Sequence, residues 1–101
     1  MRVSLLSEAS ADLDGIADYI RKSNPSRARS FIHELLQKIN GLSSMAESFR
    51  VLPRYAASGL RRRVHKPYQI FYIADVARDV VHVVRVLHTS RDTDPLLLRY
   101  E

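Results

Sequence analysis

The chain opens with a short apolar run that passes into a helical pattern. Residues 3–7 have the length and character of a first strand. Serine is a residue type that caps helix N-termini, so we expect a helix from Ser7 to about Lys22. Helical spacing assigns one set of residues to its buried face (Ala9, Leu13, Ile16, Ala17 and Ile20) and another to its outer face (Asp12, Asp14 and Asp18).

A second helix is predicted directly after the first. Asn24 is a good N-cap and Pro25 fits the first helical turn, so this pair marks a new helix start. Helical spacing then continues to about residue 43, and the apolar residues that carry it are Ala28, Phe31, Ile32, Leu35, Ile39 and Leu42. Two amphipathic helices joined by so few residues form an antiparallel hairpin.

The second half of the chain contains the short apolar runs of β-strands. Residues 45–59 show no apolar period and contain Pro53 and Gly59, which predicts a loop. Strands are predicted at residues 60–65, 69–74 and 80–88. Residues 70–73 are apolar on both faces, which indicates a central strand. We expect the three leucines at 96–98 to dock at the edge of the core.

These elements define the fold class as α+β, with the order β-α-α-β-β-β in a single domain of residues 1–101. We expect an antiparallel sheet of three to four strands with the two-helix hairpin packed on one face. The other face, or part of it, would then be free for a partner.

Composition narrows the class of protein further. Hydrophobic residues make up 46% and charged residues 27% of the chain, as in soluble globular proteins. The absence of cysteine excludes disulfides and a thiolate nucleophile and fits a cytoplasmic location. The apolar start is too short for a signal peptide or a membrane span. Histidine and acidic residues are too scattered for a zinc site, so we expect no metal and no cofactor.

The net charge of +5 is unevenly distributed. Residues 1–49 carry six basic and six acidic side chains, whereas residues 50–101 carry ten basic and five acidic ones. Between Arg50 and Lys66 there are six basic residues and no acidic one. Such a field favours an acidic protein surface or a nucleic acid as partner, although a solvated arginine-rich face would give the same pattern.

Several motifs, in their order and spacing, resemble the ParE/RelE toxin superfamily over nearly the whole chain. The motifs are Ala11-Asp12-Leu13 with Ile16 and Tyr19-Ile20, Pro25 with Ala28 and Phe31, Gly59-Leu60-Arg61, Tyr68-Gln69-Ile70-Phe71-Tyr72, and Arg85-Val86-Leu87-His88 followed by Arg91-Asp92. The last two motifs together are similar to the ParE branch in particular.

This resemblance implies a RelE/ParE-like fold and the toxin component of a type II toxin–antitoxin system, of the plasmid stabilisation kind. Members of the ParE branch inhibit bacterial growth by binding DNA gyrase, and a ParD-like antitoxin silences them with an extended C-terminal segment. RelE-type members are instead ribosome-dependent mRNA endoribonucleases. A homologue that is not toxic and only binds an antitoxin is a third alternative, and direct nucleic-acid contact stays open.

A metal-independent ribonuclease needs a base, an acid and cations for the developing phosphate charge. Glu47, Arg62 and His88 are the residues that could supply these groups. Glu47 falls in a loop, and no lysine-rich helix like that of RelE is present, so we favour action by binding. His88 ends a strand and can instead cap backbone groups or bond Asp92.

Arginines in the second half are the candidates for partner binding. Arg61 and Arg63 share one face of their strand, and Arg62 points to the other. Arg85 is assigned to the same face as neighbouring apolar residues, where an unpaired guanidinium is costly. It must therefore pair with an acid such as Glu47 or Asp92, or face a partner groove. The candidate contacts to a target or antitoxin are Arg61, Arg63, Arg85, His88 and Arg91.

Overall fold

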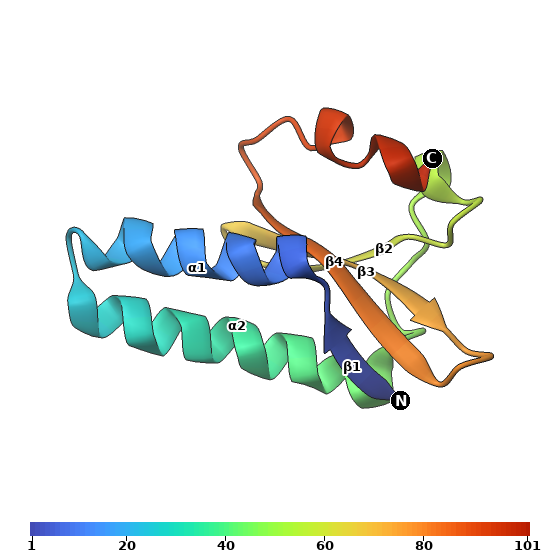
Figure 1. Ribbon diagram of the computed structural model, residues 1–101, viewed down its shortest axis with the longest axis horizontal. Helices are drawn as coiled ribbons and strands as arrows, with labels where there is room; N and C mark the ends of the chain where they lie inside the picture. The colour runs from blue at the N-terminus through green and yellow to red at the C-terminus, as the bar shows by residue number, and fades with distance from the viewer.

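The computed structural model describes residues 1–101 and combines a helical hairpin with one four-stranded sheet (Figure 1). The elements are β1 (Arg2–Leu5), α1 (Ser7–Arg21), α2 (Pro25–Met45), β2 (Arg61–His65), β3 (Tyr68–Asp75) and β4 (Val80–His88). Short 3-10 helices lie at Pro53–Tyr55, Asp94–Leu96 and Leu98–Tyr100. The predicted α+β class and order of elements are confirmed.

The two helices start in different ways. The side chain of Asn24 accepts a hydrogen bond from the Arg27 amide, and Pro25 occupies the first position of α2, as predicted. At α1 the N-cap is Leu6, with no side-chain hydrogen bond, so the prediction that Ser7 caps this helix was wrong. Because Leu6 packs against the core, tertiary contact rather than a polar cap sets the start of α1. Neither helix is long and apolar enough to span a membrane.

The sheet has the strand order β1-β4-β3-β2. β3 is central and pairs antiparallel with both β4 and β2, as its apolar sequence predicted. β1 joins the other side of β4 in parallel, so the sheet is mixed rather than wholly antiparallel. A β-bulge interrupts the β3–β4 register, because Phe71 pairs with Arg85 while the next residue, Tyr72, pairs with Val83.

The larger apolar core lies between the helical hairpin and the sheet. One stripe of each helix supplies half of it, including Leu13, Leu35 and Ile39, and alternate residues of β3 and β4 supply the rest. The buried Tyr72 hydroxyl donates to the Ala46 carbonyl at 2.8 Å. No buried side-chain nitrogen or oxygen in this layer therefore lacks a hydrogen-bond partner. This core fixes the helices on one face of the sheet.

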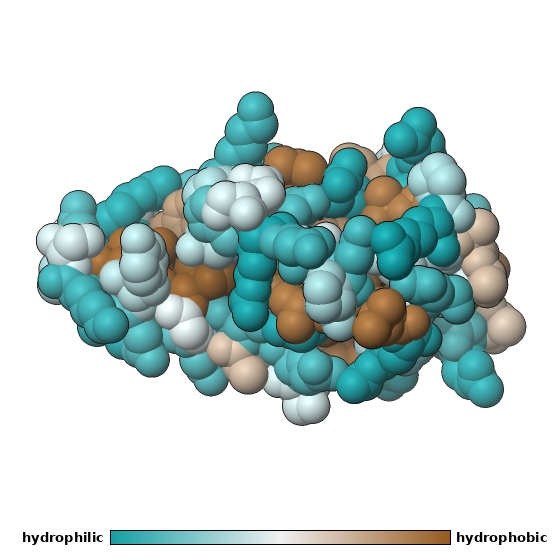
Figure 2. All heavy atoms as spheres, turned by 90° about the horizontal axis from the view of Figure 1, so that it is seen from above, coloured by the Kyte–Doolittle hydropathy of each residue, from teal (hydrophilic) through white to brown (hydrophobic).

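A second apolar cluster lies on the opposite face, under the C-terminal segment (residues 89–101). Leu97 is 1% exposed and packs into it, whereas Leu98 is 59% exposed. The C-terminal segment therefore covers part of the second face instead of docking at the core edge, because β3 and β4 are apolar on both sides. Arg54 holds it through ion pairs to Asp94 and Glu101, both at 2.8 Å. Figure 2 shows polar side chains over most of this side, with apolar atoms between them.

Candidate functional site

Arg85 forms a largely buried ion pair with Asp12 that joins β4 to α1. Its Nε and Nη2 atoms donate to the two Asp12 carboxylate oxygens at 2.8 and 2.9 Å. The same carboxylate accepts the backbone N–H of Val86 at 2.9 Å. The side chains of Arg85 and Asp12 are only 13% and 12% exposed. These hydrogen bonds to Asp12 raise the pKa of Arg85 above its ordinary value, so the guanidinium is always charged.

This pair corrects two sequence predictions. Asp12 does not lie on the outer face of α1. Arg85 does pair with an acid, as expected, but this acid is Asp12 rather than Glu47 or Asp92. The β-bulge at Arg85 explains the second error, since it breaks the alternation from which its face was assigned. Val83 packs in the helix-side core and Leu87 in the cluster of the other face. Arg85 emerges between these two layers, at the edge of α1.

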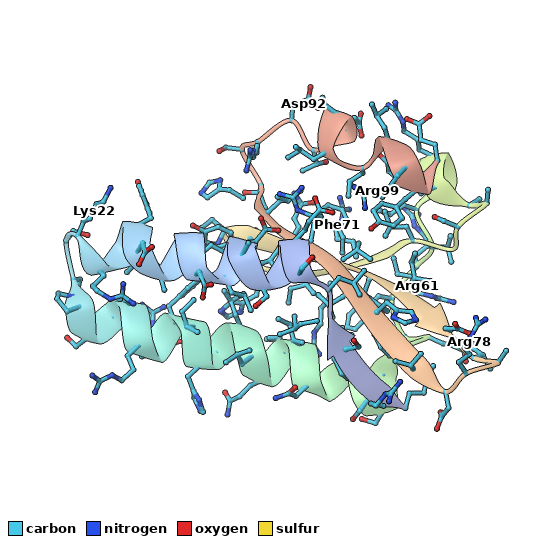
Figure 3. All side chains as sticks on the ribbon, in the orientation of Figure 1. Lys22, Arg61, Phe71, Arg78, Asp92 and Arg99 are labelled. Atoms are coloured by element: carbon cyan, nitrogen blue, oxygen red, sulfur yellow. The ribbon has the colours of Figure 1, made fainter.

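A polar network continues from Arg85 to the C-terminal segment. Glu8 lies 3.5 Å from Arg85 and 3.2 Å from Arg99, so one carboxylate bridges two guanidinium groups. Figure 3 shows Arg99 on the C-terminal segment, on the side of the sheet where Phe71 lies. The network ties α1, β4 and the C-terminal segment together at this point.

The arginines of β2 are also engaged within the protein. Arg61 donates to the Phe49 carbonyl at 2.6 Å, and Arg63 donates to the Lys38 carbonyl at 2.9 Å while lying over the Phe49 ring. Arg63 therefore binds the second half of α2, and Arg61 binds the segment that follows the helix. Arg62 points to the other face and bonds the Gln69 side chain at 3.0 Å. The predicted division of the three arginines between two faces is confirmed.

His88 lies at the rim of an open hollow of about 280 Å³ between α1 and the adjoining ends of β3 and β4. Its Nδ1 atom accepts the Ser90 backbone N–H at 3.0 Å, so His88 caps a turn but bonds Ser90 rather than Asp92. The ring meets Tyr68 edge to face, with 5.1 Å between the centroids. Arg91 lines the same hollow and is exposed. Of the predicted binding residues, His88 and Arg91 are the two that the fold brings to one open site.

Glu47 lies elsewhere. It follows α2 and lines a different hollow beside Met1, at the N-terminal edge of the sheet. Arg62 belongs to neither hollow and bonds across to β3. The fold therefore does not bring Glu47, Arg62 and His88 together. No group of three histidine, aspartate or glutamate side chains is arranged to hold a metal ion.

A third hollow, of about 400 Å³, lies between the end of α1 and the start of α2. Apolar side chains form much of its lining and two arginines stand beside them; the lining residues are Ala17, Arg21, Pro25, Ala28, Arg29 and Ile32. Sequence reasoning did not predict this groove, because it assigned Ala17, Ala28 and Ile32 to the buried faces of the helices.

Two solved structures share this arrangement of helices and strands. A chromosomal ParDE toxin–antitoxin system from P. aeruginosa matches with a TM-score of 0.74 at 18% identity, over 87% of this chain and 95% of that chain. The toxin–antitoxin complex RelBE2 from Mycobacterium tuberculosis matches with a TM-score of 0.66 at 20% identity, over 86% and 95%. The fold is thus that of the ParE/RelE class.

The sequence places the chain more narrowly within that class. The model of the family described as the ParE toxin of the type II toxin–antitoxin system parDE matches residues 3–93. The chain belongs to this family, which confirms the resemblance on which the sequence interpretation rested. A search of curated proteins gave no match.

Proposed function

We propose that this protein is a toxin that inhibits bacterial growth by binding DNA gyrase and is neutralised by a ParD-like antitoxin. The family match over residues 3–93 carries the proposal. The fold supports action by binding because Glu47, Arg62 and His88, the catalytic residues that the sequence suggested, lie on separate surfaces. Fold alone does not decide between these activities, since one scaffold serves both.

The antitoxin is proposed to occupy the groove between the end of α1 and the start of α2. An apolar lining flanked by Arg21 and Arg29 suits a segment that presents apolar and acidic side chains in turn. Reversing one of these charges, in Arg29→Glu, should weaken antitoxin binding about tenfold in a calorimetric titration. Arg50→Glu is the matched control, because Arg50 is also exposed and does not line the groove. Equal losses from both variants would argue for a general charge effect instead.

The ribonuclease alternative keeps one specific observation in its favour. His88 and Arg91 lie together with Tyr68 in an open hollow, so an imidazole, a guanidinium and a phenol are available at one place. The toxin's activity must therefore be tested against both targets in parallel.

The deciding experiment compares induced expression with two assays of the purified protein. Expression without antitoxin should arrest growth, and the protein should inhibit supercoiling by gyrase while leaving ribosome-bound mRNA intact. Cleavage of mRNA at defined codon positions, with unaffected supercoiling, would establish the ribonuclease alternative. Normal growth with soluble protein present would identify a homologue that binds an antitoxin without being toxic.

A further inference from the structure

The hollow between α1 and the ends of β3 and β4 contains a glycine that the fold itself does not need. Gly15 lies within α1, where glycine destabilises a helix relative to alanine. A Cβ atom added there would meet no atom within 4 Å, and the backbone is ordinary helix. The missing side chain leaves the α1 side of the hollow open. A residue that weakens the helix and keeps a surface open indicates a site shaped for an external group.

The hollow also contains a buried tyrosine whose hydroxyl has no partner in the protein. The Tyr68 side chain packs in the core, and the residue is 8% exposed. The Tyr68 hydroxyl forms no hydrogen bond within the protein. Because the protein has no fully buried side-chain oxygen that lacks a partner, this hydroxyl must be accessible from outside, and it opens into the hollow. Burial, and then the nearby phenol of Tyr19, raises the pKa of Tyr68. Two phenol groups therefore approach each other here, and Tyr19 is 71% exposed.

The charge of the hollow selects an acidic group. Arg91 is exposed and has no ion pair, whereas the one acid in the lining, Asp12, is neutralised by Arg85. The groups around the opening are thus a guanidinium, two phenols and the His88 ring, whose Nδ1 atom already accepts the Ser90 amide. The guanidinium and the phenols can donate to a carboxylate.

A protein fits this hollow better than a nucleic acid does. An extended polyanion needs several phosphate contacts, but this hollow offers a single arginine. Along α1, beside the hollow, Asp14 is exposed and would repel a phosphate backbone. Exposed tyrosine and arginine around a small depression are instead the residue types that dominate protein–protein binding energy.

We propose that this hollow receives an anchor of the target protein, consisting of an apolar or aromatic side chain against Gly15 and Tyr19 and a neighbouring carboxylate on Arg91 and the Tyr68 hydroxyl. The proposal rests on the proposed function, and it locates the toxin's contact with gyrase. It also separates that contact from the antitoxin groove, which other residues of α1, Ala17 and Arg21, line.

Gly15→Gln fills the hollow without disturbing the fold. Because nothing lies within 4 Å of the new Cβ, the urea midpoint should stay the same or rise. Binding to purified gyrase and inhibition of supercoiling should weaken at least about tenfold, as for a blocked hot spot. Ser10→Gln is the matched control, since Ser10 is exposed on the same helix and does not line the hollow. It should leave gyrase inhibition unchanged.

Tyr68→Phe and Tyr72→Phe form a second matched pair. Removing the unpartnered Tyr68 hydroxyl should leave stability unchanged and weaken gyrase binding about fivefold to tenfold. Removing the Tyr72 hydroxyl, which bonds Ala46, should lower the urea midpoint but leave the affinity of the folded protein for gyrase unchanged. A merely structural role for Tyr68 predicts instead that Tyr68→Phe, like Tyr72→Phe, lowers the urea midpoint and leaves gyrase binding unchanged.

The outcomes separate the site from the proposed function. If the wild type inhibits gyrase and Gly15→Gln inhibits it equally well, the site is refuted while the function stands. If the wild type does not inhibit gyrase, the function fails and the site fails with it. Binding of a labelled single-stranded RNA that is lost in Tyr68→Phe would also overturn the proposal, by showing a nucleic-acid occupant.

Discussion

The ion pair between Asp12 and Arg85 allows the sharpest test of how this fold is held together. Asp12→Ala removes two hydrogen bonds to the guanidinium and the acceptor of the Val86 amide. Arg85 would then remain as a charge with 13% of its side chain exposed, between α1 and the C-terminal segment. Only Glu8, 3.5 Å away and 47% exposed, would still compensate it.

The size of the effect follows from these contacts. Removing one member of a buried ion pair costs about 3–5 kcal/mol, because the other charge is left without a partner. Stranding the Val86 N–H costs about 1–3 kcal/mol more if water does not reach it. Glu8 and partial solvent access reduce the sum, so we expect a loss of about 3 kcal/mol. That is a large fraction of the roughly 5–15 kcal/mol that stabilises a typical domain.

Urea unfolding followed by circular dichroism measures this loss. The midpoint of Asp12→Ala should fall with an unchanged slope, whereas Asp14→Ala, on the exposed side of α1, should change stability by less than about 0.5 kcal/mol. Adding Arg85→Met should restore part of the loss, because it removes the stranded charge. A loss below about 1 kcal/mol for Asp12→Ala would refute the conclusion that this pair fixes α1 on β4.

Three further changes test other parts of the fold. Leu97→Ala should cost about 2–3 kcal/mol in urea unfolding, because Leu97 is 1% exposed and anchors the C-terminal segment. Tyr72→Phe should cost about 1–2 kcal/mol in the same assay, since it leaves the Ala46 carbonyl without its donor. Burial and the hydrogen bond to Asp94 raise the pKa of Tyr55 to about 12, so the folded state holds this proton more tightly. The free energy of unfolding should therefore fall by about 1–2 kcal/mol, after allowance for solvent screening, as the pH rises from about 10 to 12. Thermal unfolding measured over this pH range should show the loss in the wild type and not in Tyr55→Phe.

Local signals predicted most of the secondary structure because they act over a few residues. Asn24 and Pro25 set the start of α2 through a cap and a fixed backbone angle, both of which depend on neighbouring residues alone. β4 spans Val80–His88, the range predicted from its apolar run. The start of α1 was assigned wrongly to a Ser7 cap, since its position depends on the burial of Leu6, which is a tertiary effect.

The candidate site was less predictable because two of its features arise from long-range pairing. The bulge opposite Phe71 and Tyr72 changes the face on which Arg85 emerges, and no periodicity in the strand reveals it. A usable signal did exist in α1, where Asp12 occupies the position three residues after Ala9, within the apolar stripe. An acid in that position indicates a buried cationic partner, and Arg85 is that partner.

The basic surplus of the second half does not form a basic surface, and this bears on the kind of partner. Arg61 and Arg63 are bonded to backbone carbonyls of α2 and of the segment after it, and Arg85 is paired with Asp12. Charges that are used inside a fold contribute little to counterion release, which is the main source of affinity for nucleic acids. Arg91, which has no such partner, lies at a small hollow rather than along a continuous track. Three of the arginines of the second half are therefore used within the fold, and Arg91 is the cation at the hollow, which has the size of one anchoring side chain.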